Sequence, residues 1–83
     1  MKNMKATRDR LIDCFLVVFP KLSRDEAPLA TIDSTDGWDS TEHFMLMGVI
    51  EEEFGVSIPE EMIGEIVSFS GFEDYLKSQG APV

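Results

Sequence analysis

The chain has 83 residues, which is enough for a single domain over 1–83, and its 43% hydrophobic content supports a modest core. Acidic residues outnumber basic ones by 16 to 7, so the formal net charge is −9. A field of that sign repels nucleic acid and anionic membrane surfaces, so neither is an expected partner. A domain of this size also leaves little room for a deep catalytic cleft, which favours a binding or carrier module over an enzyme.

Cys14 is the only cysteine, so an internal disulfide and a clustered-cysteine metal site are both excluded. Its apolar neighbours predict a buried thiol. The charged first residues are not followed by a cleavable apolar leader, and the apolar run at 14–20 is far too short to span a bilayer. We therefore expect a cytoplasmic protein without membrane insertion.

The first expected element is a helix over about residues 7–19. One side of this segment carries apolar residues at helical spacing, namely Leu11, Cys14, Phe15, Val18 and Phe19. The apolar run from residue 14 also fits a buried strand, but the polar lead-in and the total length favour a helix. Pro20 ends it.

A long connection over 21–38 follows, rich in Ser, Thr and Asp. Long loops in compact domains are usually functional or are pinned by their own apolar side chains. The residues expected to pin this loop are Leu22, Leu29, Ile32 and Trp38.

The second helix is expected over 40–54, with Gly55 as its stop. Asp39 and Glu42 fit a capping box in which Asp39 is the N-cap, and this leaves the Ser40 hydroxyl free of capping. The expected inward stripe is Phe44, Met47, Ile50 and Phe54. The methionine-rich stretch at 45–49 fits plain core, or an interior that parts to admit an acyl chain.

A short third helix is expected over 59–66, with Pro59 in its first turn and Met62, Ile63 and Ile66 on its buried side. A last helix should begin at a cap on Ser68 or Ser70 and end near Gln79. The sum is an all-α fold, a small bundle of three longer helices plus one short helix, with a long loop between helices 1 and 2. The ends, about 1–5 and 80–83, are expected to fray.

Ser40 places a hydroxyl in the first turn of an acidic helix, beside free backbone N–H groups and in a positive helix-end field. A phosphodiester attached there would gain roughly 0.3–1 kcal/mol from that field. The alternative is that Ser40 only helps to begin the helix, as Ser and Asp commonly do.

Four segments in order carry a resemblance to a known family: Gly-Trp-Asp-Ser at 37–40, Glu-Glu-Glu-Phe-Gly-Val at 51–56, Ile-Pro at 58–59 and Phe-Glu-Asp-Tyr-Leu at 72–76. Together they resemble a free-standing acyl carrier protein. The resemblance covers nearly the whole chain, and the ordered set at this spacing is specific where a lone Asp-Ser is not.

In that family the serine after the aspartate receives 4′-phosphopantetheine from coenzyme A through a magnesium-dependent transferase. The resemblance implies that Ser40 is the attachment residue and Asp39 its motif partner. The arm would hold acyl or aminoacyl groups as thioesters in a specialised fatty-acid, lipid or polyketide/peptide pathway. Implied partners are a phosphopantetheinyl transferase and a loading ligase, ketosynthase or acyltransferase with basic docking patches. The carrier itself is expected to be a monomer.

The resemblance also implies that the second helix is the docking face, through Thr41, Glu42, Glu51 and Glu52. An ordinary solvated acidic face is the alternative reading. Exposed ion pairs contribute only about 0–1 kcal/mol each, so such docking would be transient and salt-sensitive. Thr41 is a departure, because the family usually has leucine there, and it puts recognition by a general transferase in doubt.

Other functions fit less well. His43, the only histidine, is expected at the surface with no catalytic role. A calcium loop fails on spacing: with Gly37 as its sixth position, the first and twelfth would be Ile32 and His43. A carrier-fold adaptor or structural protein that is not phosphopantetheinylated stays open because of Thr41.

Overall fold

The computed structural model describes residues 6–80, and this part of the chain is a small all-α bundle. Its elements are α1 (Thr7–Val18), the 3-10 turn η1 (Ala27–Leu29), α2 (Ser40–Phe54), α3 (Glu60–Ile63) and α4 (Phe69–Ser78). Three longer helices and one short helix are therefore present, as the sequence predicts. Of the ends expected to fray, about 1–5 and 80–83, residues 1–5 and 81–83 lie outside the described residues.

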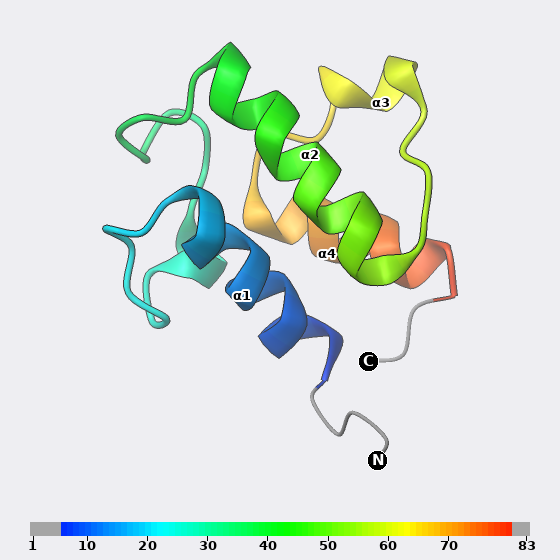
Figure 1. Ribbon diagram of the computed structural model, residues 1–83, viewed down its shortest axis with the longest axis horizontal. Helices are drawn as coiled ribbons and strands as arrows, with labels where there is room; N and C mark the ends of the chain where they lie inside the picture. Colours follow the sequence, from blue (N-terminus) through cyan, green and yellow to red (C-terminus); the bar gives the residue numbers. More distant parts are fainter. Residues whose placement is uncertain (1–5, 81–83) are drawn as a thin grey trace.

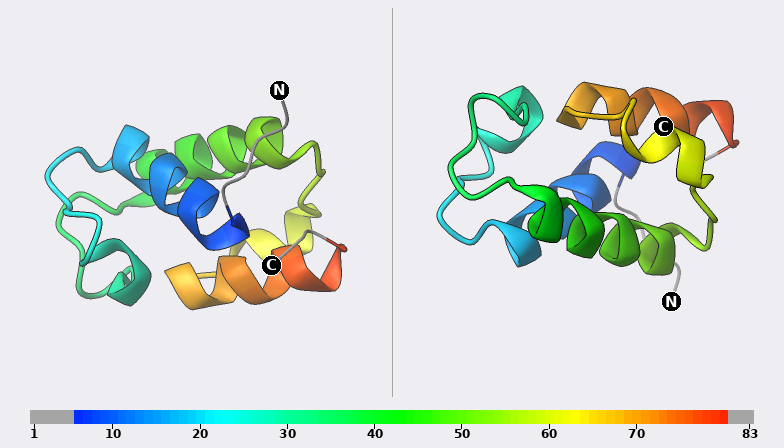
Figure 2. Two further views of the ribbon diagram at one scale, coloured as in Figure 1. Left: turned by 90° about the horizontal axis from the view of Figure 1, so that it is seen from below. Right: turned by 90° about the horizontal axis from the view of Figure 1, so that it is seen from above.

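Helix α1 packs along α2, while α4 and η1 lie together on another side of α1 (Figures 1 and 2). The long loop between α1 and α2 covers one end of the bundle. An isolated antiparallel bridge between Thr31 and Ser68 ties this loop to the start of α4. The segment carrying α3 runs along the side of α2 that faces away from α1 in Figure 1.

Phe15 stands at the centre of the core and is fully buried. Its ring centroid lies 5.5 Å from that of Trp38, 5.1 Å from Phe69, 6.0 Å from Phe72 and 6.1 Å from Phe19. Such aromatic pairs contribute about 0.5–1.5 kcal/mol each beyond their buried area. The cluster joins α1, the long loop and α4.

The helix ends follow capping chemistry. Asp39 accepts a hydrogen bond from the Glu42 N–H at 3.0 Å, and Gly55 closes α2 at a φ of +66°. Ser68, rather than Ser70, caps α4 by accepting from the Gly71 N–H at 3.0 Å. The bounds of α2 and the start of α4 therefore match the sequence expectation.

Helix α1 ends at Val18 and α4 at Ser78, each within one residue of the predicted end, whereas α3 is shorter than predicted. Helix α3 covers only Glu60–Ile63, because Pro59 is its N-cap and the chain turns at Gly64. That turn allows Ile66, which is 4% exposed, to enter the core.

Three predicted core residues are exposed. Leu29 is 79% exposed, because η1 directs Ala27 and the following Ala30 into the core instead. Phe44 and Met45 are 62% and 54% exposed. The side of α2 that is buried carries His43, Leu46, Met47 and Ile50. The inward face of this helix is thus set by position 43, not by position 44.

Ion pairs fasten α1 to its neighbours. Arg8 donates two 2.9 Å hydrogen bonds to the buried Glu73 of α4. Arg10 donates to the Glu53 carboxylate at 2.8 Å and to the Glu53 carbonyl at 2.7 Å, at the end of α2.

No helix among residues 6–80 is long and apolar enough to cross a membrane.

Candidate functional site

Ser40 is the first residue of α2, and its side chain is exposed to solvent. Within residues 6–80 the structure records no hydrogen bond for its hydroxyl. Asp39 performs the capping, so the hydroxyl is left available, as the sequence predicts. The first N–H groups of a helix lack intrahelical partners and favour an anion nearby.

Trp38 fixes the place where α2 begins. Its indole is 4% exposed and lies with its centroid 5.5 Å from that of Phe15 and 5.4 Å from that of Phe19. Gly37, at a φ of +85°, provides the turn that brings the loop to this buried anchor. Ser40 follows Trp38 closely in the chain, so the buried indole restrains the position of the hydroxyl.

His43 is not a surface residue, contrary to the sequence expectation. It is 7% exposed, and its Nδ1 accepts from the Trp38 indole N–H at 2.9 Å. Indole nitrogen can only donate, so Nδ1 carries no proton and the proton of a neutral ring is on Nε2. Nε2 then donates to the Ile63 carbonyl at 2.7 Å. His43 therefore links the loop, α2 and α3 from one turn beyond Ser40.

The surface of α2 next to Ser40 is partly apolar. Thr41, Phe44 and Met45 are all exposed, and Glu42 is half-buried at the edge of this face. The exposed ring of Phe44 is contrary to the sequence expectation, which placed this residue in the core. The spacing of His43, Leu46, Met47 and Ile50, at i, i+3, i+4 and i+7, is the signal that would have found the true inward face.

The predicted partner-binding carboxylates divide into two groups. Glu42 lies in the first turn of α2 beside Thr41, whereas Glu51 and Glu52 lie near the far end, about 14–15 Å away along the axis at 1.5 Å per residue. Glu51 accepts a hydrogen bond from the Ile58 N–H at 2.7 Å, so it holds the linker to α3. Glu52 is exposed.

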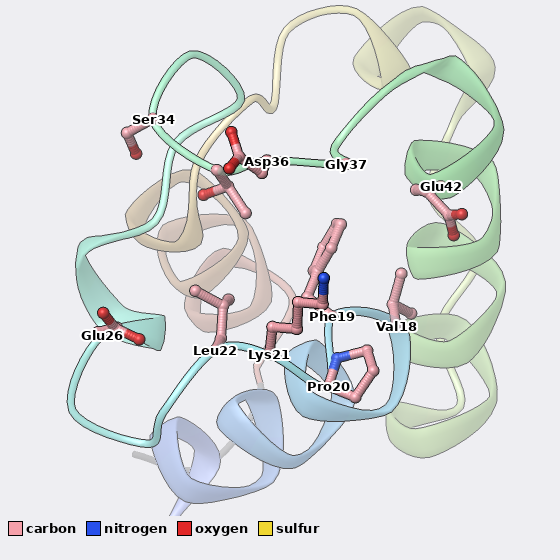
Figure 3. Close-up of a pocket in the computed structure, with 11 residues that line it drawn as sticks. Val18, Phe19, Pro20, Lys21, Leu22, Glu26, Ser34, Asp36, Gly37 and Glu42 are labelled. Atoms are coloured by element: carbon pink, nitrogen blue, oxygen red, sulfur yellow. The ribbon is translucent and has the colours of Figure 1, made fainter.

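A cavity of about 520 Å³ lies between the loop and the start of α2 (Figure 3). Its lining combines apolar residues from the end of α1 with carboxylates and one lysine. The apolar and charged residues of the lining include Val18, Phe19, Lys21, Leu22, Glu26, Asp36 and Glu42. No pattern in the sequence predicts this cavity.

A second cavity of about 250 Å³ borders the Cys14 thiol between α1 and α2. The thiol is buried, as predicted, and burial raises its pKa to about 12. A thiol with such a pKa is almost entirely protonated at neutral pH, so Cys14 is a poor nucleophile. Its role is packing.

No three His, Cys, Asp or Glu side chains within residues 6–80 gather so as to hold a metal ion. Comparison of the sequence with protein-family models and with curated proteins finds no match to either. The functional interpretation therefore depends on the motif around Ser40 and on the geometry described above.

Proposed function

We propose that this chain is a carrier protein, modified at Ser40 by 4′-phosphopantetheine and loaded there with acyl or aminoacyl groups as thioesters. The exposed, unbonded hydroxyl at the first residue of an Asp-capped helix is the observation that carries this proposal. Thioester formation and cargo transfer would be the work of partner enzymes, so the chain itself catalyses no reaction.

The chemistry of attachment suits this position. In the transfer step the Ser40 oxygen would bond to the phosphorus nearest the pantetheine of coenzyme A, and the pyrophosphate bond would break to release adenosine bisphosphate. The serine proton would leave to a base of the transferase. The resulting phosphodiester anion would lie in the positive field at the start of α2.

The partners we propose are enzymes with basic docking patches: a phosphopantetheinyl transferase and a loading ligase, ketosynthase or acyltransferase. The net charge of −9 favours such partners. Exposed Phe44 and Met45 offer the apolar contact that Thr41 is too small to make. This surface supports recognition by a transferase despite the absence of leucine at position 41.

The sequence favours a carrier that is monomeric and cytoplasmic and that serves a specialised fatty-acid, lipid or polyketide/peptide pathway. A carrier-fold adaptor without the arm is the alternative, and Thr41 is the feature that favours it. The two functions differ in one chemical property, namely whether Ser40 accepts phosphopantetheine.

Intact-mass spectrometry tests the proposal. The purified protein is incubated with coenzyme A, magnesium and a transferase of broad specificity, and should gain the mass of one phosphopantetheine group. Ser40→Ala should gain nothing. Ser70→Ala is the matched control, because Ser70 is an exposed serine in the first turn of α4. No gain in the wild type would favour the adaptor. An equal gain in Ser40→Ala would show that the group is attached to another residue, and either result would contradict the proposal.

A further inference from the structure

The cavity of about 520 Å³ beside the start of α2 is of the size that holds small ligands. Gly37 and Glu42, which line it, lie three residues before and two residues after Ser40. Three residues of chain span at most about 11 Å. A pantetheine arm is longer than that, so a group at its end can reach the cavity from Ser40.

The floor of the cavity is apolar. Val18 and Leu22 are half-buried there and pack against the core, and Phe19 beneath them is 6% exposed. These side chains come from the end of α1 and the turn that follows it. They form a surface on which a small aliphatic or aromatic side chain would lose contact with water favourably.

Charged groups surround this floor. In Figure 3 the Lys21 side chain lies across the middle of the cavity, with the carboxylates of Glu26, Asp36 and Glu42 around it. Glu26 accepts a hydrogen bond from the Ser23 N–H at 2.9 Å through one oxygen. Within residues 6–80 neither Lys21, Asp36 nor Glu42 has an ion-pair partner.

The lining therefore fits a ligand that combines a positive charge, a hydrogen-bond acceptor and an apolar group. Three carboxylates against one ammonium favour a ligand with a positive charge. Lys21 offers N–H donors to a carbonyl oxygen, and the floor suits an apolar side chain. A plain acyl chain matches the apolar floor alone and would gain nothing from the carboxylates of Asp36 and Glu42.

We propose that this cavity binds the aminoacyl group of an apolar α-amino acid carried on the Ser40 arm. The α-ammonium group lies toward Asp36 and Glu42, the thioester carbonyl accepts from Lys21, and the side chain rests on Val18 and Leu22. This assignment rests on the proposed function and narrows its cargo to aminoacyl groups.

Binding of a free cargo analogue tests the cavity without the arm. Leucinamide, which has the ammonium, the carbonyl and the apolar side chain but no carboxylate, is titrated into ¹⁵N-labelled Ser40→Ala protein. We expect amide shifts centred on Leu22, Gly37 and Glu42. The analogue without the amine, 4-methylpentanamide, should bind about fivefold or more weakly, the factor of one favourable ion pair. n-Butylammonium, which has only the charge and a chain, should also bind more weakly.

Variants decide whether the cavity carboxylates are responsible. Asp36→Asn/Glu42→Gln should weaken leucinamide binding roughly three- to tenfold, since each exposed ion pair contributes up to about fivefold. Glu60→Gln/Glu61→Gln makes the same change in net charge on α3, away from the cavity, and should leave binding unchanged. Equal binding of leucinamide and 4-methylpentanamide, equal loss in both double variants, or no shifts at the cavity would overturn the proposal.

Two further comparisons distinguish free amino acid from thioester-linked cargo, and the cavity proposal from the proposed modification of Ser40. Tighter binding of free leucine than of leucinamide would show that a carboxylate is required, which contradicts a role for thioester-linked cargo. Because these titrations use Ser40→Ala, they do not depend on attachment of the arm. Failure here leaves the mass gain at Ser40 intact, and failure of that mass gain would leave a cavity that binds leucinamide.

Discussion

The Trp38 indole N–H donates to His43 Nδ1 across 2.9 Å, and this bond determines which nitrogen of His43 carries the proton. With Nδ1 occupied as an acceptor, Nε2 donates to the Ile63 carbonyl at 2.7 Å. Three segments of the chain thereby meet in one buried polar chain. The same Trp38 restrains the loop that delivers Ser40 to the surface.

Replacing Trp38 by Phe should lower the free energy of unfolding. The variant removes the N–H and leaves Nδ1 of the buried His43 without a donor, which costs about 1–3 kcal/mol, and the smaller ring adds a packing loss. Urea denaturation followed by far-ultraviolet circular dichroism measures the change, since the variant lacks tryptophan fluorescence. His43→Leu and the double variant complete a cycle, and strictly additive effects would show that the two side chains are not coupled.

Two glycines, one within α2 and one at its C-cap, should respond in opposite directions to alanine. Gly55 has a φ of +66°, so Gly55→Ala should destabilise the protein by about 1–2 kcal/mol. Gly48 is an exposed residue within the helix with open space around its Cβ position, so Gly48→Ala should stabilise it by about 0.5–1 kcal/mol. Denaturation midpoints test the pair, and changes of the same sign would contradict the assigned backbone.

The Asp39 side chain should stabilise α2 as its N-cap, whether or not a modifying enzyme also contacts it. Asp39→Ala removes the acceptor of the Glu42 N–H and should cost about 0.5–2 kcal/mol. Asp39→Asn should retain most of the stability, because asparagine caps about as well. Asp33→Ala, in the exposed loop, is the charge control. If Asp39→Asn lost as much stability as Asp39→Ala, the charge of Asp39 and not its hydrogen bond to the Glu42 N–H would be the source of the stabilisation.

The Arg8–Glu73 pair should make stability depend on acid pH. The Arg8 hydrogen bonds hold the pKa of the Glu73 carboxyl below its ordinary value. A carboxyl with a lowered folded-state pKa stabilises the fold above its unfolded pKa, and this contribution is lost as the pH falls through the folded value. Glu73→Gln should therefore be less stable than the wild type at pH 7, with a gap that narrows on acidification. Asp74→Asn, which removes one carboxylate from an exposed position of the same helix, is the charge control.

Capping chemistry explains why α2 could be predicted so closely. Asp39, Glu42 and Gly55 are local signals, and each acts on residues within one turn. The buried His43 had no such signal, because its acceptor is the carbonyl of Ile63, twenty residues onward. Burial of that ring also displaced Phe44 to the surface.

Features of the long loop depended on tertiary contacts in the same way. The predicted pin Trp38 is buried, but Leu29 points outward, because η1 uses Ala27 and Ala30 for close packing. The cavity beside α2 combines residues as distant as Val18 and Glu42. Such a combination becomes visible only once the loop has been folded over the end of α1.

Peptide mapping is the most direct test of the central claim, that Ser40 carries the prosthetic arm. The wild-type protein, treated with coenzyme A, magnesium and a broad transferase, is digested, and each serine-containing peptide is fragmented by tandem mass spectrometry. The carrier account predicts phosphopantetheine on Ser40 and on no other serine. An unmodified Ser40, or the group found on a different residue, would contradict it.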